Sequence, residues 1–338
     1  MIDGPDLPFV SVIIPVRNEE GFIGRCLQAI AAQDYPRDRF ETIVLDGGST
    51  DSTEDEVRVT AEAASLTVYY APNPKRTAAS GFNLGLTLAH GDVIVRLDGH
   101  SRPAGDFLSA SVRTLEQTGA DAVGGPIETR GFGEVGRAIA LAMSSRFGIG
   151  DTAFRNAGAA MQDTDTVPFG AYRRDVFERI GQLAEDIDRG EDDEFNYRLR
   201  DAGGRIVLSP DIRSTYYCRD TFPALAQQYW SYGIAKAAVL RRHPNRLHSR
   251  HLVPSALVGV LGAGIVLGGV IKPLGRLAAL AAASYAAANG FATVRLAREN
   301  KREARYLPFA FACIHLSAGA GMLVGFARTF LQAKQRNA

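Results

Sequence analysis

The sequence predicts an α/β domain with a mainly parallel sheet, followed by a C-terminal transmembrane helical region. Three observations lead to this fold class. Short apolar runs alternate with helical patterns in the N-terminal part, three long uncharged runs follow residue 251, and charge is divided unevenly between these parts. With 46% hydrophobic and 22% charged residues, the composition excludes a disordered or collagen-like chain.

The net charge of +1 hides two parts of opposite sign. Residues 252–338 contain 10 of the 38 Lys and Arg but only 2 of the 37 Asp and Glu, which gives +8 there and −7 elsewhere. The near-neutral total argues against a dedicated nucleic-acid binder, so no nucleic-acid partner is expected. Cys26, Cys218 and Cys313 lie far apart, which argues against a disulfide framework or a cysteine-rich zinc site and favours a reducing compartment.

Apolar runs and helical patterns alternate along the first part of the chain. The runs predict strands at 10–15, 42–45, 66–70 and 93–97. Helical periodicity covers 20–33 and 77–89, and Ser49 or Asp51 is expected to cap a helix after the second strand. This order indicates parallel strands with helices on both faces, and ligands of such sheets bind beyond the carboxyl ends of the strands.

Three apolar runs predict membrane helices, at 252–271, 277–294 and 306–327. The first has 20 residues without a charge, enough to cross a hydrocarbon core of about 30 Å. Basic flanks before residue 252 and at 295–305 are expected on the cytoplasmic side, which two crossings satisfy. A third crossing would leave basic C-terminal residues outside, so a re-entrant third segment is the alternative. Residues 1–9 lack a signal-peptide pattern, so the part before residue 252 is expected in the cytoplasm.

Polar clusters follow three of the predicted strands. Pro15 leads into Val-Arg-Asn-Glu, Asp46 into Gly-Gly-Ser-Thr-Asp, and Asp98 into Gly-His. The carboxyl ends of parallel strands meet at one edge of the sheet, so these side chains are expected to form one ligand site.

The order and spacing of these segments resemble family 2 inverting glycosyltransferases of the GT-A fold, over about residues 8–240. The segments are VSVIIPVRNEE, DGGSTDST, NLGLTLAHGDVIVRLDGHSRP and GEDDEFNYRLRDAGG. Within that family, LDGHSRP, SSRFGIG and QYWSYG are similar to the membrane-bound glucosyltransferase group of succinoglycan and other bacterial exopolysaccharide assembly.

The resemblance implies that the strand ends bind a nucleotide sugar. The expected residues are Pro15, Arg17, Glu19, Asp46, Gly48, Lys75 and Arg76. Asp46 would accept the uracil N3–H, which favours a UDP-linked donor, and Glu19 would bind ribose hydroxyls. A simple turn at Asp46, and a solvated pair at Lys75 and Arg76, are the alternatives.

Asp98-Gly99-His100 stands where the family carries Asp-x-Asp to hold Mg²⁺ or Mn²⁺. Asp98 would ligate the metal, and a neutral His100 would shift the preference from Mg²⁺ toward Mn²⁺. The metal would act as a Lewis acid on the diphosphate leaving group. A purely structural histidine is the alternative for His100.

The acidic run at 191–194 is typical of a helix N-terminus. The family places its catalytic base in a Glu-Asp pair here, so the resemblance assigns Glu191 and Asp192 to catalysis, with Asp192 as the base and Asp193 as its competitor. A raised pKa would make Asp192 a better base.

Two further site residues follow from the resemblance. Gly170 is expected to allow close approach of substrate. Trp230 falls where processive relatives carry Gln-x-x-Arg-Trp, but the arginine is missing, which favours addition of one sugar per encounter. Trp230 would stack on a sugar or anchor at the membrane interface. Residues 222–242 are expected to lie on the membrane surface, and 138–147 either there or in the core.

We therefore expect a GT-A domain at 1–220, an interfacial helix with a basic flank at 221–251, and a region of two to three membrane helices at 252–338. The expected function is metal-dependent, inverting transfer from a nucleotide sugar to a lipid-linked saccharide, in exopolysaccharide or cell-envelope glycan assembly at the cytoplasmic face of the inner membrane. Membrane lipid and a second copy of the chain are possible partners. The alternatives are a polyprenyl-phosphate glycosyltransferase and a non-catalytic nucleotide-sugar-binding scaffold.

Overall fold

The protein is described here by a computed structural model that covers residues 7–150, 152–155, 160–187 and 189–336. The chain divides into two compact units. The first comprises Met1–Glu128 and Ala153–Tyr217, and the second comprises Thr129–Thr152 and Cys218–Ala338. Residues 129–152 thus group with the C-terminal part, which the predicted boundaries at 220 and 251 do not anticipate. The roles expected for the segments 1–220, 221–251 and 252–338 stay predictions.

An eight-stranded sheet forms the centre of the first unit, in the order β3-β2-β1-β4-β9-β6-β10-β8. The strands are β1 (Val10–Val16), β2 (Phe40–Asp46), β3 (Val68–Pro72), β4 (Val93–Arg96), β6 (Ala122–Gly124), β8 (Gln162–Asp163), β9 (Ala171–Arg173) and β10 (Ile206–Leu208). Strands β3, β2, β1 and β4 are parallel, as are β6 and β10, whereas β8 and β9 run antiparallel to their neighbours. The prediction of a mainly parallel α/β sheet is confirmed.

The predicted elements form, with small shifts at their ends. The helical patterns become α1 (Ile23–Ala31) and α3 (Ala78–Leu88), and the third strand starts two residues later than expected. The predicted cap of α2 (Thr53–Ala63) is wrong, because the N-cap residue is Ser52. The Asp51 Oδ1 instead accepts a hydrogen bond from the first helical N–H at 3.1 Å.

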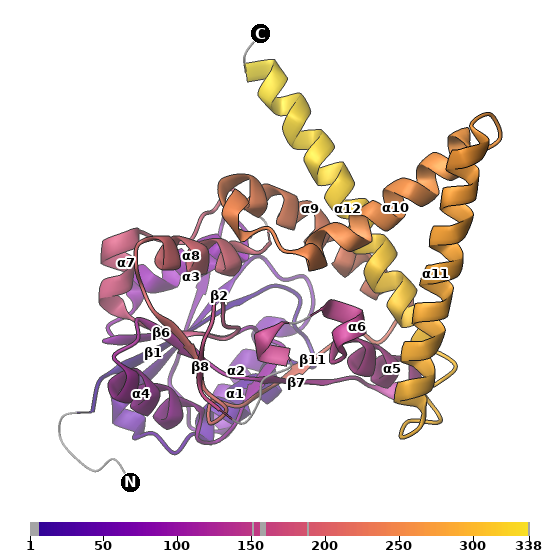
Figure 1. The fold of residues 1–338 in the computed structure, drawn as a ribbon. Helices are drawn as coiled ribbons and strands as arrows, with labels where there is room; N and C mark the ends of the chain where they lie inside the picture. The colour runs from indigo at the N-terminus through magenta and orange to yellow at the C-terminus, as the bar shows by residue number, and fades with distance from the viewer. Residues whose placement is uncertain (1–6, 151, 156–159, 188, 337–338) are drawn as a thin grey trace. The chain divides into compact units, whose positions relative to one another are not determined.

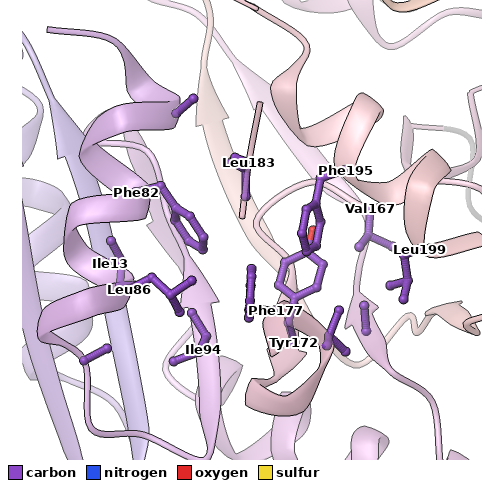
Figure 2. Packing of buried hydrophobic residues seen from close by; sticks show 14 of the residues in the cluster. Ile13, Phe82, Leu86, Ile94, Val167, Tyr172, Phe177, Leu183, Phe195 and Leu199 are labelled. Carbon is purple, nitrogen blue, oxygen red and sulfur yellow. The ribbon is translucent and has the colours of Figure 1, made fainter. Parts of the chain in front are cut away.

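Helices cover both faces of the sheet (Figure 1). On one face lie α3, α7 (Arg174–Ile180) and α8 (Glu191–Asp201), and on the other lie α1, α2 and α4 (Phe107–Thr118). Figure 2 shows the core under the first group, where the ring centroids of Phe82 and Phe177 lie 5.7 Å apart and those of Phe177 and Phe195 lie 5.0 Å apart. Burying one such side chain contributes about 1.5–3 kcal/mol. Phe195 therefore holds α8, whose first turn is acidic, against the sheet.

A smaller pairing completes the first unit beside the strand ends. Strand β5 (Ser101–Pro103) pairs antiparallel with β11 (Ser214–Tyr217), so that Tyr216 lies opposite Ser101. The chain passes from the first unit to the second within β7 (Ile127–Arg130).

The second unit is helical. Its helices are α5 (Gly133–Met143), α6 (Arg146–Ile149), α9 (Phe222–Arg242), α10 (Ser249–Leu267), α11 (Lys272–Ala297) and α12 (Leu307–Arg336). For residues 138–147 the core alternative is the observed one, because Ala138, Ile139, Ala142 and Met143 are all buried in a helix that contacts α12. The expected helix over 222–242 forms as α9, but one side of it packs along α12 rather than facing lipid.

Glycines allow α9 and α12 to approach closely. A Cβ built on Gly321 would lie 2.2 Å from the carbonyl oxygen of Trp230, and one on Gly233 would lie 2.3 Å from that of Ala318. Small residues allow this kind of backbone contact between helices. The contact depends on the absence of a side chain at these positions.

In the part of the chain that the structure describes, two helices are long and apolar enough to cross a membrane, namely α11 and residues 307–328 of α12. The apolar part of α10, His251–Leu267, is shorter than the uncharged run in the sequence, because the helix ends at Leu267, before Gly268 and Gly269. Apolar side chains of α10 and α11 are widely exposed, including Ile265 at 84% and Phe291 at 72%. Such exposure is typical of a lipid-facing surface.

Candidate functional site

Asp46 ends β2 with both carboxylate oxygens hydrogen-bonded. Oδ1 accepts from the Ser49 N–H at 3.0 Å and from its hydroxyl at 2.7 Å, and Oδ2 accepts from the Tyr70 hydroxyl at 2.7 Å. Burial and this bond raise the pKa of Tyr70. The carboxylate is therefore fixed at the strand end, in the turn expected as one alternative. Oδ2, which accepts one of these bonds, keeps a further lone pair.

The ends of β1 and β2 lie side by side. Val16 pairs with Asp46, and Pro15 packs near α3, where a Cβ on Gly81 would lie 3.1 Å from its Cβ. Gly48 has a φ of +77°, a backbone conformation that favours glycine. A Cβ built on Gly48 would lie 3.5 Å from Nε of Arg76, so the structure brings this arginine to the two strand ends. Arg17 is exposed in the loop after β1.

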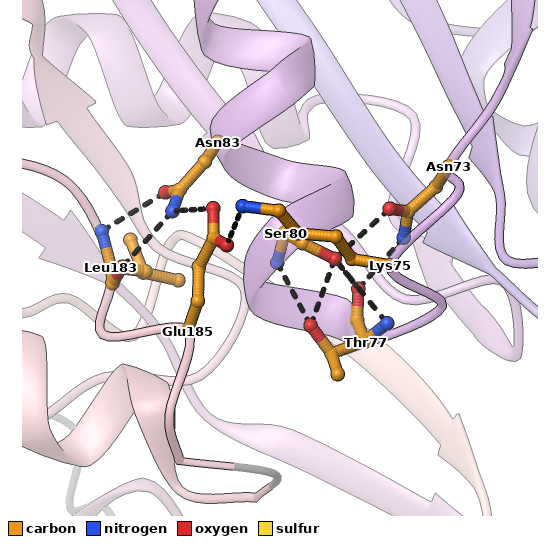
Figure 3. A network of polar contacts seen from close by, with 7 residues as sticks. All are labelled: Asn73, Lys75, Thr77, Ser80, Asn83, Leu183 and Glu185. Carbon is orange, nitrogen blue, oxygen red and sulfur yellow. Dashed lines mark hydrogen bonds and ion pairs between the residues drawn. The ribbon is translucent and has the colours of Figure 1, made fainter.

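Lys75 has a partner of its own. Figure 3 shows that its ammonium donates to Glu185 at 2.5 Å, while the other carboxylate oxygen of Glu185 accepts from Asn83 at 3.1 Å. These contacts hold the pKa of Glu185 below its usual range. Of the two predicted cations, Lys75 would have to leave an ion pair to bind phosphate.

The Asp98-Gly99-His100 segment follows β4. Nδ1 of His100 lies 2.9 Å from Oε1 of Glu19, and the histidine ring meets the edge of Tyr216 at a centroid distance of 5.3 Å. A Cβ on Gly99 would lie 2.9 Å from Cγ of Glu19. The structure thus joins the loop after β1 to the segment after β4.

Arg96 connects the two predicted catalytic segments. Its guanidinium donates to Oε1 of Glu191 at 2.6 Å and lies 3.7 Å from carboxylate oxygens of both Asp98 and Asp192. Burial alone would lower the pKa of Arg96, but the three carboxylates outweigh it and raise the pKa. One buried cation therefore brings the Asp98 segment and the first turn of α8 together.

Glu191 and Asp192 differ in their surroundings. The side chain of Glu191 is 5% exposed and bound to Arg96, whereas that of Asp192 is 40% exposed. The pKa of the Asp192 carboxyl is raised to about 7. Desolvation is the largest cause; Arg96 acts against it, and Asp193 and Glu191 add to it. Asp192 is therefore the carboxyl of the pair that both reaches solvent and has the properties of a general base at neutral pH.

The sequence of the chain settles its family. Residues 11–181, half of the chain, match the model of glycosyl transferase family 2. The chain belongs to this family. The sequence resemblance stated above is thereby confirmed.

This glycosyltransferase is similar to several described proteins. It is 31% identical, over 69% of its length and 74% of the other, to the dolichyl N-acetyl-alpha-D-glucosaminyl phosphate 3-beta-D-2,3-diacetamido-2,3-dideoxy-beta-D-glucuronosyltransferase of Methanococcus voltae. It is 29% identical to succinoglycan biosynthesis protein ExoA of Rhizobium meliloti (strain 1021), over 74% of its length and 75% of the other. The mannosyltransferase PcManGT from Pyrobaculum calidifontis, solved with GDP-Man and Mn²⁺, matches 94% of this chain and 88% of its own with a TM-score of 0.62 and 22% identity. The last likeness establishes the GT-A fold.

The residues of this glycosyltransferase offer a metal ion two donors of suitable chemistry, the Asp98 carboxylate and the second ring nitrogen of His100. Within the described ranges, no group of three or more His, Cys, Asp or Glu side chains is arranged to hold a metal ion. The donor set suits an ion that takes its remaining ligands from a diphosphate and water, as Mg²⁺ and Mn²⁺ do in phosphate sites.

Gly170 and Trp230 each have packing contacts in this glycosyltransferase, and the site roles expected for them stay predictions. A Cβ on Gly170 would lie 2.7 Å from the ring of Tyr172, and the Gly170 carbonyl accepts from the Arg96 N–H at 3.0 Å. Packing thus explains this glycine without a substrate. Trp230 lies on α9 of the second unit, with its backbone against Gly321.

Arg96 is a site residue that the sequence patterns above do not predict. The sequence does contain an indication of it, because an arginine inside the apolar run VIVRL needs a buried partner. The partner, Glu191, lies 95 residues further along the chain.

Proposed function

We propose that this protein is an inverting, metal-dependent glycosyltransferase that moves a sugar from a nucleotide donor to a lipid-linked saccharide. One observation carries the proposal. Arg96 lies between Asp98, the expected metal ligand, and Asp192, the expected base, at 3.7 Å from each. The expected metal ligand and the expected base therefore both lie beside one buried cation.

Asp192 is the general base of the proposed reaction. Its carboxylate removes the proton of an acceptor hydroxyl as that oxygen attacks the anomeric carbon. The new carbon–oxygen bond forms as the bond to the nucleoside diphosphate breaks, and attack from the opposite face inverts the centre. Glu191 accepts a hydrogen bond from Arg96 and positions the start of α8.

Asp98 and His100 would hold the divalent ion, Mn²⁺ or Mg²⁺, beside the diphosphate. The ion would supply Lewis-acid stabilisation of the departing negative charge. Asp46 at the end of β2 would accept the N3–H of uracil through a free lone pair, which favours a UDP-linked donor. Pro15, Arg17, Gly48 and Arg76 would line the same edge.

Membrane attachment supports the choice of acceptor. Helix α11 and part of α12 are long and apolar enough to span a bilayer. The names of two similar proteins refer to a dolichyl-linked sugar phosphate and to succinoglycan. We infer a multi-pass protein of the inner membrane with its GT-A domain on the cytoplasmic side, acting in exopolysaccharide or envelope glycan assembly.

Transfer by the purified full-length protein tests this function. The protein in detergent would be given a panel of UDP- and GDP-linked sugars, with polyprenyl-diphosphate saccharides and polyprenyl monophosphate as acceptors. We expect Mn²⁺-dependent transfer to a diphosphate-linked saccharide. Asp192→Asn should reduce transfer by about 10²–10⁴-fold, the usual contribution of a general base, with unchanged donor binding.

The controls separate the alternatives. Asp193→Asn, at the competing carboxyl, should retain most of the activity. Transfer only to the monophosphate would favour a polyprenyl-phosphate glycosyltransferase, and donor binding without hydrolysis or transfer would indicate a scaffold. Activity that survives a chelator would exclude the metal role of Asp98 and His100.

A further inference from the structure

We propose that Glu19 is a positioning residue that fixes the ring of His100 so that its Nε2 faces the metal ion. This inference rests on the proposed function, in which Asp98 and His100 hold that ion. It also replaces the ribose-binding role expected for Glu19 from the family resemblance.

The contact between the two side chains defines the tautomer of His100. Its Nδ1 lies 2.9 Å from Oε1 of Glu19. A carboxylate accepts hydrogen bonds, so we assign the proton to Nδ1 as the donor of this contact. In a neutral imidazole the other nitrogen, Nε2, then keeps its lone pair. Histidine ligands in proteins commonly donate their second ring N–H to such a carboxylate, which orients the ring and raises its basicity.

Glu19 is itself held in place. Its backbone N–H donates to the hydroxyl of Thr53 at 2.8 Å, and its side chain is only 17% exposed. Gly99 leaves room for it, because a Cβ there would lie 2.9 Å from Cγ of Glu19 and 3.1 Å from Cγ1 of Val16. The side chain of Glu19 therefore leaves little room for a Cβ at position 99, between Asp98 and His100.

The ring of His100 also contacts Tyr216, at a centroid distance of 5.3 Å and with the two ring planes 70° apart. Tyr216 is positioned by the pairing of β11 with β5. The contacts with Glu19 and Tyr216 together restrict the orientation of the His100 ring.

Binding of Mn²⁺ to the full-length protein in the presence of UDP, which supplies the diphosphate ligands, tests the role of Glu19. Removing an outer partner of a histidine ligand typically costs 10–100-fold in metal affinity. We expect this loss for Glu19→Ala and a smaller one for Glu19→Gln, which keeps an acceptor oxygen. Electron paramagnetic resonance of bound Mn²⁺ should show histidine nitrogen coupling in the wild type and a weaker coupling in Glu19→Ala. Glu20→Ala, at the neighbouring carboxylate, should change neither quantity.

Two further measurements decide between positioning and direct donor binding. If Glu19 acts through His100, Glu19→Ala should cause no additional loss of Mn²⁺ affinity in a His100→Ala protein, and metal-free binding of uridine should be unchanged. Weaker uridine binding with unchanged Mn²⁺ affinity would overturn the inference and restore a ribose role. Bound Mn²⁺ without nitrogen coupling in the wild type would overturn it while leaving metal dependence intact. A wild type that binds no Mn²⁺ would overturn both this inference and the metal part of the proposed function.

Discussion

Arg96 and its carboxylates show how single residues define this site. The buried guanidinium binds Glu191 at 2.6 Å and lies within 3.7 Å of Asp98 and Asp192. Glu191 is thereby held in an ion pair, while the side chain of Asp192 keeps access to solvent. A pair of adjacent carboxyl groups thus acquires two different sets of properties from their surroundings, as general acids and bases in enzymes often do.

The raised pKa of Asp192 predicts the pH dependence of transfer. Only the deprotonated carboxylate can accept the proton of the acceptor hydroxyl. With a pKa of about 7, the rate should rise with pH below neutrality and level off above it. Initial transfer rates at saturating donor, measured from about pH 5 to about pH 9, should show both the rising and the level part of this profile. Donor binding should stay constant over that range, and a limb near the ordinary carboxyl pKa would contradict the assignment.

Removing the Arg96 cation should leave Glu191 buried and unpaired. Breaking a buried ion pair by removing one partner costs about 3–5 kcal/mol, so Arg96→Leu should lower the free energy of unfolding by that amount. Equilibrium unfolding of the purified protein in detergent measures it. Arg58→Leu breaks an exposed pair with Asp55, in which Arg58 is 68% exposed, and should change stability by less than about 1 kcal/mol. Equal effects of the two variants would refute the role of Arg96.

At the scale of elements, packing positions the chemistry. Phe195 fixes α8 against Phe177 of α7, so the acidic first turn of α8 meets the end of β4. In the second unit, α9 and α12 meet through glycines. Ion pairs join α5 to the segment before α12, with Arg137 2.7 Å from Glu303 and Arg305 2.5 Å from Glu134.

Replacing glycine by alanine should have opposite effects on stability at two positions, one in the contact between α9 and α12 and one outside it. Gly321→Ala places a Cβ 2.2 Å from the Trp230 carbonyl, and such overpacking should destabilise by about 1–3 kcal/mol. Gly290→Ala on α11 has open space around it and should stabilise by about 0.4–1 kcal/mol, because alanine favours the helix. Thermal unfolding of both variants checks the sign. A destabilisation at both positions would contradict this account of the interface.

At the scale of the whole molecule, the two apolar helices and their basic flanks imply an orientation. The segment at 295–305 is expected in the cytoplasm and the turn after α10 on the opposite side. In a background without the three native cysteines, Gly269→Cys should react with a membrane-impermeant thiol reagent from outside intact cells. Lys301→Cys should react only after the membrane is opened. Labelling of both positions from the same side would refute the predicted crossing.

Much of the molecule follows from local patterns in its sequence. Apolar runs and helical periodicity determine where β1, β2, β4, α1 and α3 form, because these signals lie within each segment. Uncharged length likewise identifies the helices of the C-terminal region. The order of polar motifs after the strands indicates the family, and the family model confirms it.

Only the tertiary structure decided which residues meet. Glu19 and His100 lie 81 residues apart in the chain, and Arg96 and Glu191 lie 95 apart. Their pairing depends on how the strands order in the sheet and how α8 packs onto it, which no local pattern encodes. The same holds for residues 129–152, which group with the C-terminal helices because the buried side of α5 contacts α12. Sequence determined the parts and the chemistry available, whereas long-range packing decided which carboxylate is buried, which is exposed, and which one orients a histidine.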